Sequence, residues 1–282
     1  MANIIRQDII HALIEAKSGH SAGPLGMADI FTAFYFHILN HRPQEPLWED
    51  RDRLILSNGH ICPVRYVAMA HAGYFQIEEL KTLRKLNSRL QGHPHRTALP
   101  GVETTSGPLG SGLSQSIGVA LAARLDAKKH RVYCLMSDGE LDSGNSWEAF
   151  MLAGKMKLNN LTAVIDRNNI QIDGYTESIM PLEPLREKFE SFRWHVIEVD
   201  GHNIRAFVDA VSEAKAIYEK PTVIIAHTIP GKGVSYMENR YEWHGNPPGV
   251  GNVSGAPPKE KQGEVALNDL RTLGGRIKSE HQ

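Results

Sequence analysis

The sequence has little cysteine, no long apolar run and no block of charges of one sign. Its two cysteines, Cys62 and Cys134, stand in neither a CxxC pair nor a metal-ligand spacing. We interpret them as small buried side chains of a protein from a reducing compartment. No stretch reaches the roughly 18 apolar residues that a membrane span requires. Charged residues interrupt the apolar N-terminus from Arg6 onward, which argues against a signal peptide and makes the cytoplasm the expected location.

The charge balance argues against a further class of functions. The 282 residues carry 31 Lys and Arg against 32 Asp and Glu, so the formal net charge is −1. The basic patch that is typical of nucleic-acid-binding proteins is therefore not indicated, and any anionic ligand must be held by local groups. Hydrophobic residues make up 41% and charged residues 22%, which is typical of a soluble globular enzyme with a sizeable core.

Short apolar segments alternate with helical patterns along the chain. This alternation predicts an α/β fold, in which a parallel sheet is covered by helices on both faces. The expected strands are residues 54–56, 132–136, 161–165, 195–199 and 222–226, and the expected helices are residues 5–16, 27–38, 113–125 and 204–217. Residues 1–245 are expected to form one domain. Residues 246–282 are expected to form a Pro/Gly-rich linker and a C-terminal helix that packs on the domain or on a partner chain.

Polar side chains follow several of these strands directly. In an open parallel sheet, ligands bind outside the carboxyl ends of the strands. The polar residues at 57–60, 137–139, 166–168 and 227–228 therefore lie where this fold would place a site.

Asp138 and Asn168, at the ends of two consecutive strands, are candidate ligands of a divalent cation. Asp138 offers a carboxylate oxygen, Asn168 an amide oxygen and Ile170 a backbone carbonyl, and Mg²⁺ prefers such oxygen donors when it is shared with phosphate groups. Gly139 has no Cβ, so a diphosphate could approach the backbone there. The helix expected after Asp142 could add its N-terminal N–H groups. An Asp-Gly pair alone is more often a simple turn, but the second half of the pattern favours a metal site.

Residues 137–174 resemble the thiamine diphosphate signature, which begins Gly-Asp-Gly and ends Asn-Asn, with Ser137 in place of the first glycine. The chain from about residue 19 to residue 244 is similar to the transketolase family, including its three histidine loops. The resemblance implies the thiamine-diphosphate-binding fold. The matching motifs are GHSAGPLGM at 19–27, DR at 52–53, SNGH at 57–60, GHP at 92–94, PGVE at 100–103, TSGPLG at 105–110, WEA at 147–149, KLNNL at 157–161, DG at 173–174, GKGVS at 231–235 and EWHG at 242–245.

The resemblance implies a role for each matched residue. The cofactor would be thiamine diphosphate with Mg²⁺, or with another divalent cation such as Ca²⁺ or Mn²⁺. The metal ligands would be Asp138, Asn168 and the carbonyl of Ile170, and the reacting sugar would meet His20, His93 and His244 as catalytic residues. The cofactor itself would contact His60, Gly107, Pro108, Leu109, Asp138, Gly139, Asn168 and His244.

Histidine suits a ketol transfer independently of the resemblance. The reaction removes a proton from a sugar hydroxyl and returns one to a carbonyl, and histidine can do both near neutral pH. Several of the 14 histidines, such as His11 and His71, carry no motif and receive no role. A zinc site at His93 and His95 is an alternative for that loop, but zinc needs three or four protein ligands.

Only the first of the three domains of a whole transketolase is recognisable. The family's pyrimidine-binding domain carries the glutamate that activates the cofactor, and a C-terminal domain follows it. We therefore expect a second subunit that supplies both domains, a heterotetramer with two copies of each chain, an exposed apolar surface on this chain, and no activity of this chain alone. The family's interface glutamate is replaced by Ser143, which puts proton communication across the interface in doubt, whereas Glu148 is retained.

The activity that the resemblance implies is transfer of a two-carbon ketol unit from a ketose phosphate to an aldose phosphate. Xylulose 5-phosphate and ribose 5-phosphate, the sugars of pentose phosphate metabolism, are the default pair, and an unusual branched sugar phosphate is an alternative. Three other interpretations remain. A subunit of a 2-oxoacid decarboxylase or dehydrogenase would not explain the histidine motifs. A non-catalytic module would not explain the retained metal ligands. The third interpretation is an α/β domain with an unknown ligand.

Overall fold

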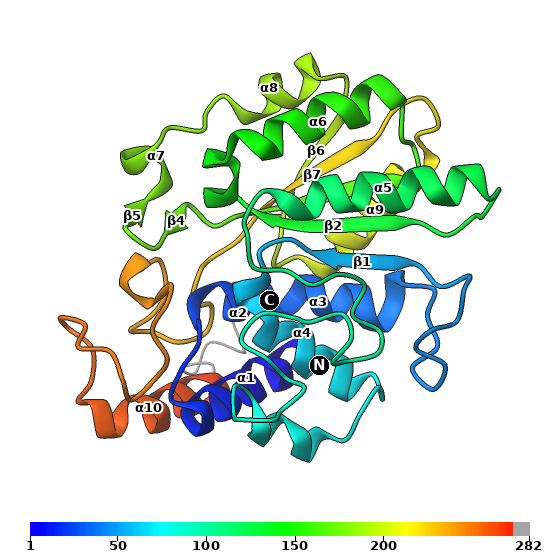
Figure 1. The fold of residues 1–282 in the computed structure, drawn as a ribbon. Coiled ribbons are helices and arrows are strands. Elements are labelled where there is room, and N and C mark those ends of the chain that lie inside the picture. Colours follow the sequence, from blue (N-terminus) through cyan, green and yellow to red (C-terminus); the bar gives the residue numbers. More distant parts are fainter. Residues whose placement is uncertain (273–282) are drawn as a thin grey trace.

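A five-stranded parallel sheet forms the centre of the molecule, seen in a computed structural model that describes residues 1–272. The strand order is β1-β2-β3-β7-β6, so β1 lies at one edge of the sheet, and after β3 the chain forms the other edge, β6, before it returns to form β7. Figure 1 shows β1 beside β2, with β6 and β7 on the far side of β2. The predicted α/β fold with a parallel sheet is confirmed. The strands are β1 (Arg53–Leu56), β2 (Val132–Ser137), β3 (Leu161–Arg167), β6 (His195–Asp200) and β7 (Thr222–His227).

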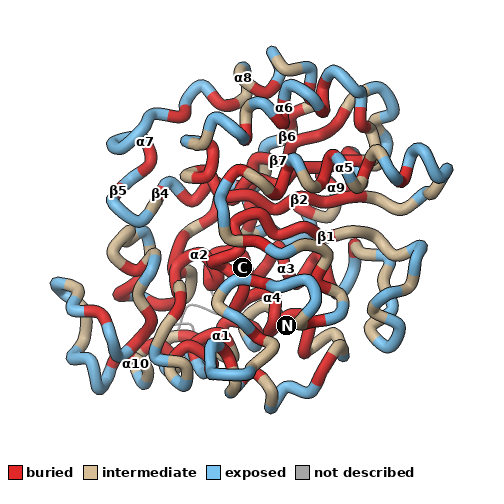
Figure 2. Tube along the Cα trace, in the orientation of Figure 1, coloured by how far each residue is buried: buried red, intermediate tan, exposed pale blue. Residues whose placement is uncertain are grey.

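The central strands are buried on both faces, which explains their continuous apolar sequences. In β2, Tyr133 and Leu135 pack into one core, whereas Cys134 and Met136 pack into a second core on the opposite face. This division follows from the two-residue period of a strand. Both strand faces are therefore covered, and the buried tube in Figure 2 runs through the middle of the molecule.

Three helices and an aromatic cluster cover one face of the sheet. The helices are α5 (Ser111–Leu125), α6 (Gly144–Met156) and α8 (Leu185–Ser191). Phe150 of α6 packs against Phe189 and Trp194, with ring centroids 4.7 and 4.9 Å apart. The indole N–H of Trp194 donates to the carbonyl of Phe150 at 2.8 Å, so this buried polar group is satisfied.

The opposite face is covered by the N-terminal helices and by α9. These are α2 (Ala22–Gly26), α3 (Ala28–Ala33), α4 (Cys62–His71) and α9 (Ile204–Ala216). Helix α1 (Ala2–Ala16) packs on α2, α3 and α4, further from the sheet. The single regular helix predicted for residues 27–38 is wrong in detail, because α3 ends at Ala33 and a π-helical turn, Phe34–Ile38, follows it. In this wider turn Tyr35 is buried together with Phe34 and Ile38, so three of its five side chains join the core.

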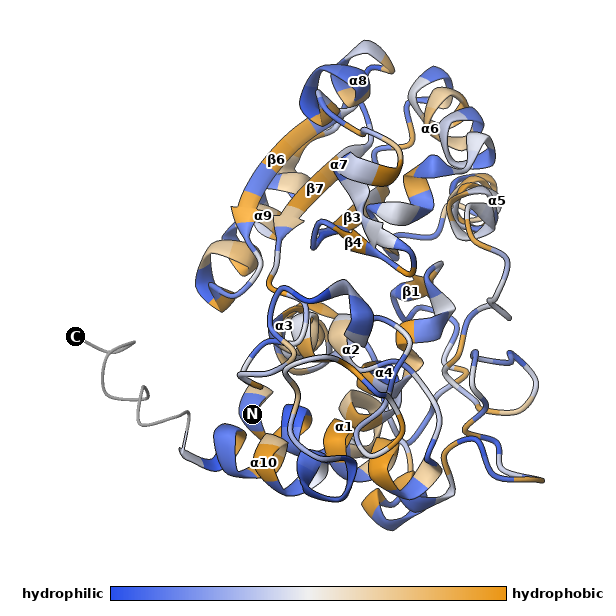
Figure 3. Cartoon of the chain, turned by 90° about the vertical axis from the view of Figure 1, so that its left-hand side faces the viewer, coloured by the Kyte–Doolittle hydropathy of each residue, from blue (hydrophilic) through white to orange (hydrophobic). Residues whose placement is uncertain are grey.

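The C-terminal helix α10 (Lys259–Thr272) packs against α1, as Figure 3 shows. Ala266 and Leu270 are buried, and the side chain of Asn3 donates to the carbonyl of Leu270 at 2.9 Å. Gln262 is also buried, and its side chain bonds the backbone of the preceding loop at Gly249, Gly251 and Pro257. The last part of the segment predicted as linker and helix, residues 273–282, lies outside the described residues.

The remaining elements are short and lie around the carboxyl ends of the strands and in the connections. Within residues 1–272, every helix is too short or too polar to cross a membrane. These elements are β4 (Ile170–Gln171), β5 (Gly174–Tyr175), α7 (Thr176–Ile179) and the 3₁₀ turns Gly59–Ile61, Ile77–Thr82, Gly139–Asp142 and Tyr241–Trp243.

Candidate active site

The polar segments that follow the strands converge at one edge of the sheet. Ser137 of β2 lies beside Asp166 of β3, and Asp166 lies beside Ala226 of β7. The strands run further than predicted, so Asp166 and Arg167 belong to β3 itself. Thr228 turns toward this edge, where its hydroxyl donates to the Asp166 carboxylate. His227, predicted in the same cluster, instead pairs with Glu198 on the surface.

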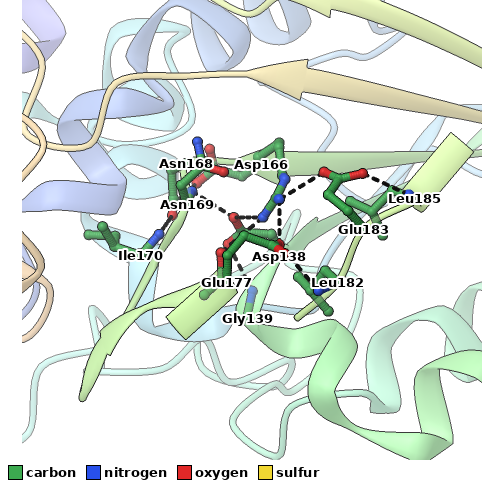
Figure 4. Close-up of polar contacts among 12 residues, drawn as sticks. Asp138, Gly139, Asp166, Asn168, Asn169, Ile170, Glu177, Leu182, Glu183 and Leu185 are labelled. Carbon is green, nitrogen blue, oxygen red and sulfur yellow. Dashed lines mark hydrogen bonds and ion pairs between the residues drawn. The ribbon is translucent and has the colours of Figure 1, made fainter. Parts of the chain in front are cut away.

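Asp138 is completely buried and is held from three directions. Its Oδ2 atom accepts from the guanidinium of Arg167 at 3.1 Å and from the backbone N–H of Asn169 at 2.7 Å. Its Oδ1 atom accepts from the N–H of Gly139 at 2.8 Å. Arg167 in turn pairs with Glu177 and Glu183, which anchors the carboxylate to the segment after β5. Figure 4 shows Glu177 and Glu183 on the same side of the site as Asp138. The carboxylate of Asp138 therefore has a fixed orientation.

Asn168 is oriented by a second buried carboxylate. Its amide nitrogen donates to Asp166 Oδ2 at 2.8 Å, so its Oδ1 atom faces the other way, where it accepts from the N–H of Ile170 at 3.1 Å. A Cβ added to Gly139 would lie 3.9 Å from the Ile170 carbonyl oxygen. The structure thus brings together the predicted trio of Asp138, Asn168 and Ile170 around Gly139.

The chemistry of this donor set fits a divalent cation bound to a phosphate group. A carboxylate, an amide oxygen and a backbone carbonyl are all hard oxygen ligands. Burial raises the pKa of Asp138 to about 6 although Arg167 opposes the shift. A cation beside Asp138 would favour the ionised form of its carboxylate, so a bound metal would offset the cost of burying this charge. Among residues 1–272 no group of three or more His, Cys, Asp or Glu side chains is arranged to hold a metal, and His95 of the alternative zinc pair bonds Thr97.

The predicted histidines come from four separate segments and lie together at the same end of the sheet, since His60 follows β1. The rings of His20, His60 and His244 lie in mutual contact, with centroid separations of 4.8, 5.0 and 5.4 Å. His93 is more exposed, and its ring lies 3.3 Å from the position that a Cβ on Gly59 would occupy. The histidine loops therefore form one cluster, although they are distant in sequence.

The enclosed position of this cluster keeps its imidazoles neutral. Burial, assisted by His244 and Arg84, lowers the pKa of His20 to about 3, and burial lowers the pKa of His244 to about 4. Burial also holds the pKa of His60 well below its ordinary value. Nδ1 of His20 and both amide atoms of the fully buried Asn58 have no hydrogen-bond partner among the described residues. Such groups are ready to bond a polar ligand.

Taken by themselves, these neutral histidines lower the stability of the isolated chain in acid. An unfolded histidine binds a proton below about pH 6.5, whereas folded His20 and His244 do so only near pH 3 and pH 4. Since the unfolded state binds more protons in this window, each histidine lowers the free energy of unfolding by about 2 kcal/mol between pH 6.5 and pH 5. The raised pKa values of Asp138 and Asp166, about 6 and about 7, act in the opposite direction.

Comparison with a variant isolates the histidine contribution. We compare the free energy of unfolding of the wild-type chain with that of the His20→Asn/His244→Asn double variant. The difference, wild type minus variant, should fall by about 4 kcal/mol between pH 7 and pH 5. Urea unfolding at both pH values measures this difference, and the carboxylates cancel because both chains contain them. A difference that does not vary with pH would contradict the neutral state of the two buried rings.

A buried glutamate fixes the loop that holds Gly107, Pro108 and Leu109. Glu140 Oε1 accepts from the hydroxyl of Ser57 and, at 2.6 Å, from the N–H of Gly110, where the backbone φ is +83°. Its Oε2 accepts from the N–H of Ser137 at 3.3 Å. The Ser57 hydroxyl also accepts from Gly112 N at 3.0 Å. This network ties the predicted cofactor loop to the ends of β1 and β2.

Several residues of the site were missed by the sequence interpretation. Four of them lie within or next to the sequence motifs, but no local sequence pattern indicates that they are buried: Asn58, Glu140, Asp166 and Arg167. Ser143, which replaces the family glutamate, precedes α6 and lies against the loop at Gly110, whereas Glu148 is exposed on α6. The predicted helix after Asp142 is present and begins at Gly144.

Comparison with known proteins identifies the chain's relatives. It is 42% identical over 243 residues to the 6-deoxy-6-sulfo-D-fructose transketolase subunit SqwG of Clostridium sp. (strain MSTE9), covering 86% of this chain and 88% of that one. It is 39% identical to one of the subunits of the apulose-4-phosphate transketolase from Phocaeicola vulgatus, covering 85% of each chain.

Longer relatives resemble this chain over only part of their length. Transketolase 2 of Escherichia coli (strain K12) is 41% identical over 92% of this chain, which spans only 40% of that protein. The transketolase structure from Leishmania mexicana superposes with a TM-score of 0.84 at 34% identity, covering 99% of this chain and 44% of that one. The family profile described as "Transketolase, thiamine diphosphate binding domain" matches residues 1–263. The chain therefore belongs to the transketolase family and contains its thiamine diphosphate binding domain.

Proposed function

We propose that this chain is one subunit of a two-chain transketolase that binds thiamine diphosphate with Mg²⁺, or with Ca²⁺ or Mn²⁺. The observation that carries the proposal is that a cluster of neutral His20, His60 and His244 and the oxygen donors of Asp138 and Asn168 lie at the same end of the sheet, because His60 follows β1 and Asp138 follows β2. An oxygen-donor site suits a metal-bound diphosphate. A cluster of neutral histidines at the same end of the sheet suits a polyhydroxylated substrate.

The residues at the sheet edge would hold the cofactor. Asp138, Asn168 and the Ile170 carbonyl would bind the cation, and Gly139 leaves its backbone open to the diphosphate. Gly107, Pro108 and Leu109 would contact the cofactor from the loop that Glu140 anchors. When bound, thiamine diphosphate supplies the thiazolium carbon that stabilises the carbanion of a ketol transfer, so the protein needs to orient and protect it.

The histidines would handle protons and recognise hydroxyl groups. A neutral imidazole has one N–H donor and one nitrogen acceptor, so it can accept a proton from a sugar hydroxyl and donate one to a carbonyl oxygen. His20 and His244 are neutral at physiological pH because they are buried. We assign these two and the more exposed His93 to the sugar, and His60 to the cofactor.

Exposed apolar side chains next to the site support the need for a second chain. Four apolar side chains, on the hairpin β4–β5, on α7 and just after it, are between 45% and 64% exposed: Ile172, Tyr175, Ile179 and Met180. Parts of these segments are pale blue in Figure 2. Apolar surface of this kind is typical of an interface. We assign it to a partner subunit that carries the pyrimidine-binding and C-terminal domains, in a heterotetramer with two copies of each chain.

The substrates would be sugar phosphates or closely related anionic sugars. The relatives act, by their names, on 6-deoxy-6-sulfo-D-fructose and on apulose 4-phosphate, so subunits of similar length serve different sugars. Xylulose 5-phosphate as donor and ribose 5-phosphate as acceptor remain the first pair to test, and a branched or sulfonated sugar is the second.

A reconstitution assay tests the proposed function. We expect ketol transfer from xylulose 5-phosphate, 6-deoxy-6-sulfofructose or apulose 4-phosphate only when this chain is mixed with the chain encoded beside it, in the presence of thiamine diphosphate and Mg²⁺. The same mixture made with the Asp138→Ala chain is the control and should be inactive. Activity of this chain alone would contradict the two-chain enzyme. Decarboxylation of pyruvate without ketol transfer would point instead to a 2-oxoacid enzyme.

A further inference from the structure

Arg84 lies outside the catalytic roles described so far but directly beside the histidine cluster. It is an exposed residue with a backbone φ of +58°, in the left-handed region that non-glycine residues rarely occupy. Its N–H donates to the carbonyl of Leu90 at 2.9 Å, which closes the loop between them. Unfavourable backbone conformations of this kind persist where the surroundings enforce them, and they are concentrated at functional sites.

The side chain of Arg84 lies between two of the histidine loops. A Cβ added to Gly92 would lie 2.8 Å from the guanidinium carbon, so the guanidinium rests directly against the backbone that precedes His93. A Cβ added to Gly19 would lie 3.7 Å from Arg84 Cδ and 3.8 Å from Nη1, next to the backbone that precedes His20. One side chain therefore touches both segments, and a side chain at Gly92 would push it away.

The positive charge of Arg84 is not neutralised by an acidic neighbour. Within residues 1–272 no carboxylate forms an ion pair with it. The other titratable groups facing His20 are the imidazoles of His60, His93 and His244, and Arg84 is the charged group that acts on His93. Burial and then Arg84 lower the pKa of His93, and Arg84 acts in the same direction on His20. The cation thus opposes protonation of both rings.

We propose that Arg84 is a positioning residue for His20 and His93, which braces the two loops that carry them and gives this side of the pocket a fixed positive charge. This inference rests on the proposed function in one respect only, namely that His20 and His93 act on a sugar substrate. The contacts of the guanidinium with both loops do not depend on that function. A cation held here adds to burial in disfavouring protonation of both imidazoles, and the neutral form is the one that can accept a proton from a sugar hydroxyl.

The titration of His93 in the isolated chain tests the electrostatic part. Because His93 is exposed, its ring signals can be followed by NMR over an accessible pH range, with His93→Asn for assignment. We expect Arg84→Gln to move the His93 midpoint to higher pH and Arg84→Lys to leave it nearly in place. Lys85→Gln is the matched control, since it removes the same charge from the neighbouring residue, whose side chain pairs with Glu15. An unchanged midpoint in a folded Arg84→Gln chain would overturn the proposal.

Kinetics of the reconstituted enzyme test the bracing part. We expect Arg84→Gln to lower kcat/KM about tenfold or more, as small misplacements of reacting groups do, and to move the acid limb of its pH profile to higher pH. Gly92→Ala keeps the charge but displaces the guanidinium, so it should lower kcat/KM as well, and Lys85→Gln should change neither. Wild-type kinetics in both Arg84→Gln and Gly92→Ala would contradict the proposal. A reconstituted wild-type enzyme that is inactive on every sugar would instead count against the proposed function, because the NMR titration does not need it.

Discussion

Binding of thiamine diphosphate should become independent of Mg²⁺, and weaker by more than about 100-fold, when Asp138 is replaced by alanine. Loss of residues that merely support a metal ligand typically costs 10- to 100-fold in metal affinity, and Asp138 would be a ligand itself. Its carboxylate is fully buried and held in a fixed orientation by Arg167, Gly139 and Asn169. Isothermal titration calorimetry with and without Mg²⁺ measures the change.

Two further variants separate metal binding from folding. Asp142→Ala removes the same charge four positions later from an exposed side chain, and it should bind the cofactor like the wild type. Asp138→Asn retains the shape of the side chain and one acceptor oxygen for Arg167 or Asn169, so its thermal unfolding should stay closer to that of the wild type. Strong Mg²⁺-dependent binding in Asp138→Ala would show that the cation is held elsewhere.

The second large effect concerns stability and should follow from replacing Glu140 by alanine. This substitution removes the acceptors of the Ser57 hydroxyl and of the N–H groups of Gly110 and Ser137. Each buried donor left without a partner costs about 1–3 kcal/mol. We therefore expect the free energy of unfolding to fall by about 4 kcal/mol, which is a large fraction of the stability of a typical domain. Urea unfolding followed by circular dichroism measures the loss.

The Glu140 variant should also loosen the loop at residues 106–112. Faster amide hydrogen exchange at Gly110 and Gly112 would report that change, because their N–H groups bond Glu140 and Ser57. Glu148→Ala on the exposed face of α6 is the matched control and should change stability by less than about 0.5 kcal/mol. A Glu140→Ala chain as stable as this control would refute the structural role of the network.

Much of the fold could be predicted because its signals are local. Strands buried on both faces are continuous apolar runs, so β2, β3 and β7 were located to within a few residues. The loops that follow them carry short motifs, and those motifs located Asp138, Asn168 and the histidines. The π-helical turn at Phe34–Ile38 was not predicted, because the apolar spacing of residues 27–38 also fits a regular α-helix.

The sequence by itself determined the class of the sheet, the position of the oxygen donors after β2 and β3, and the family. Only the tertiary structure decided which side chains meet. The order β2-β3-β7 places Thr228 against Asp166, and loops from opposite ends of the chain bring His244 onto His20. Glu140, Arg167 and Arg84 act through such contacts between distant segments. The burial of Glu140 and Arg167 and the partners of all three depend on the packed arrangement of the chain, which no local pattern of residues records.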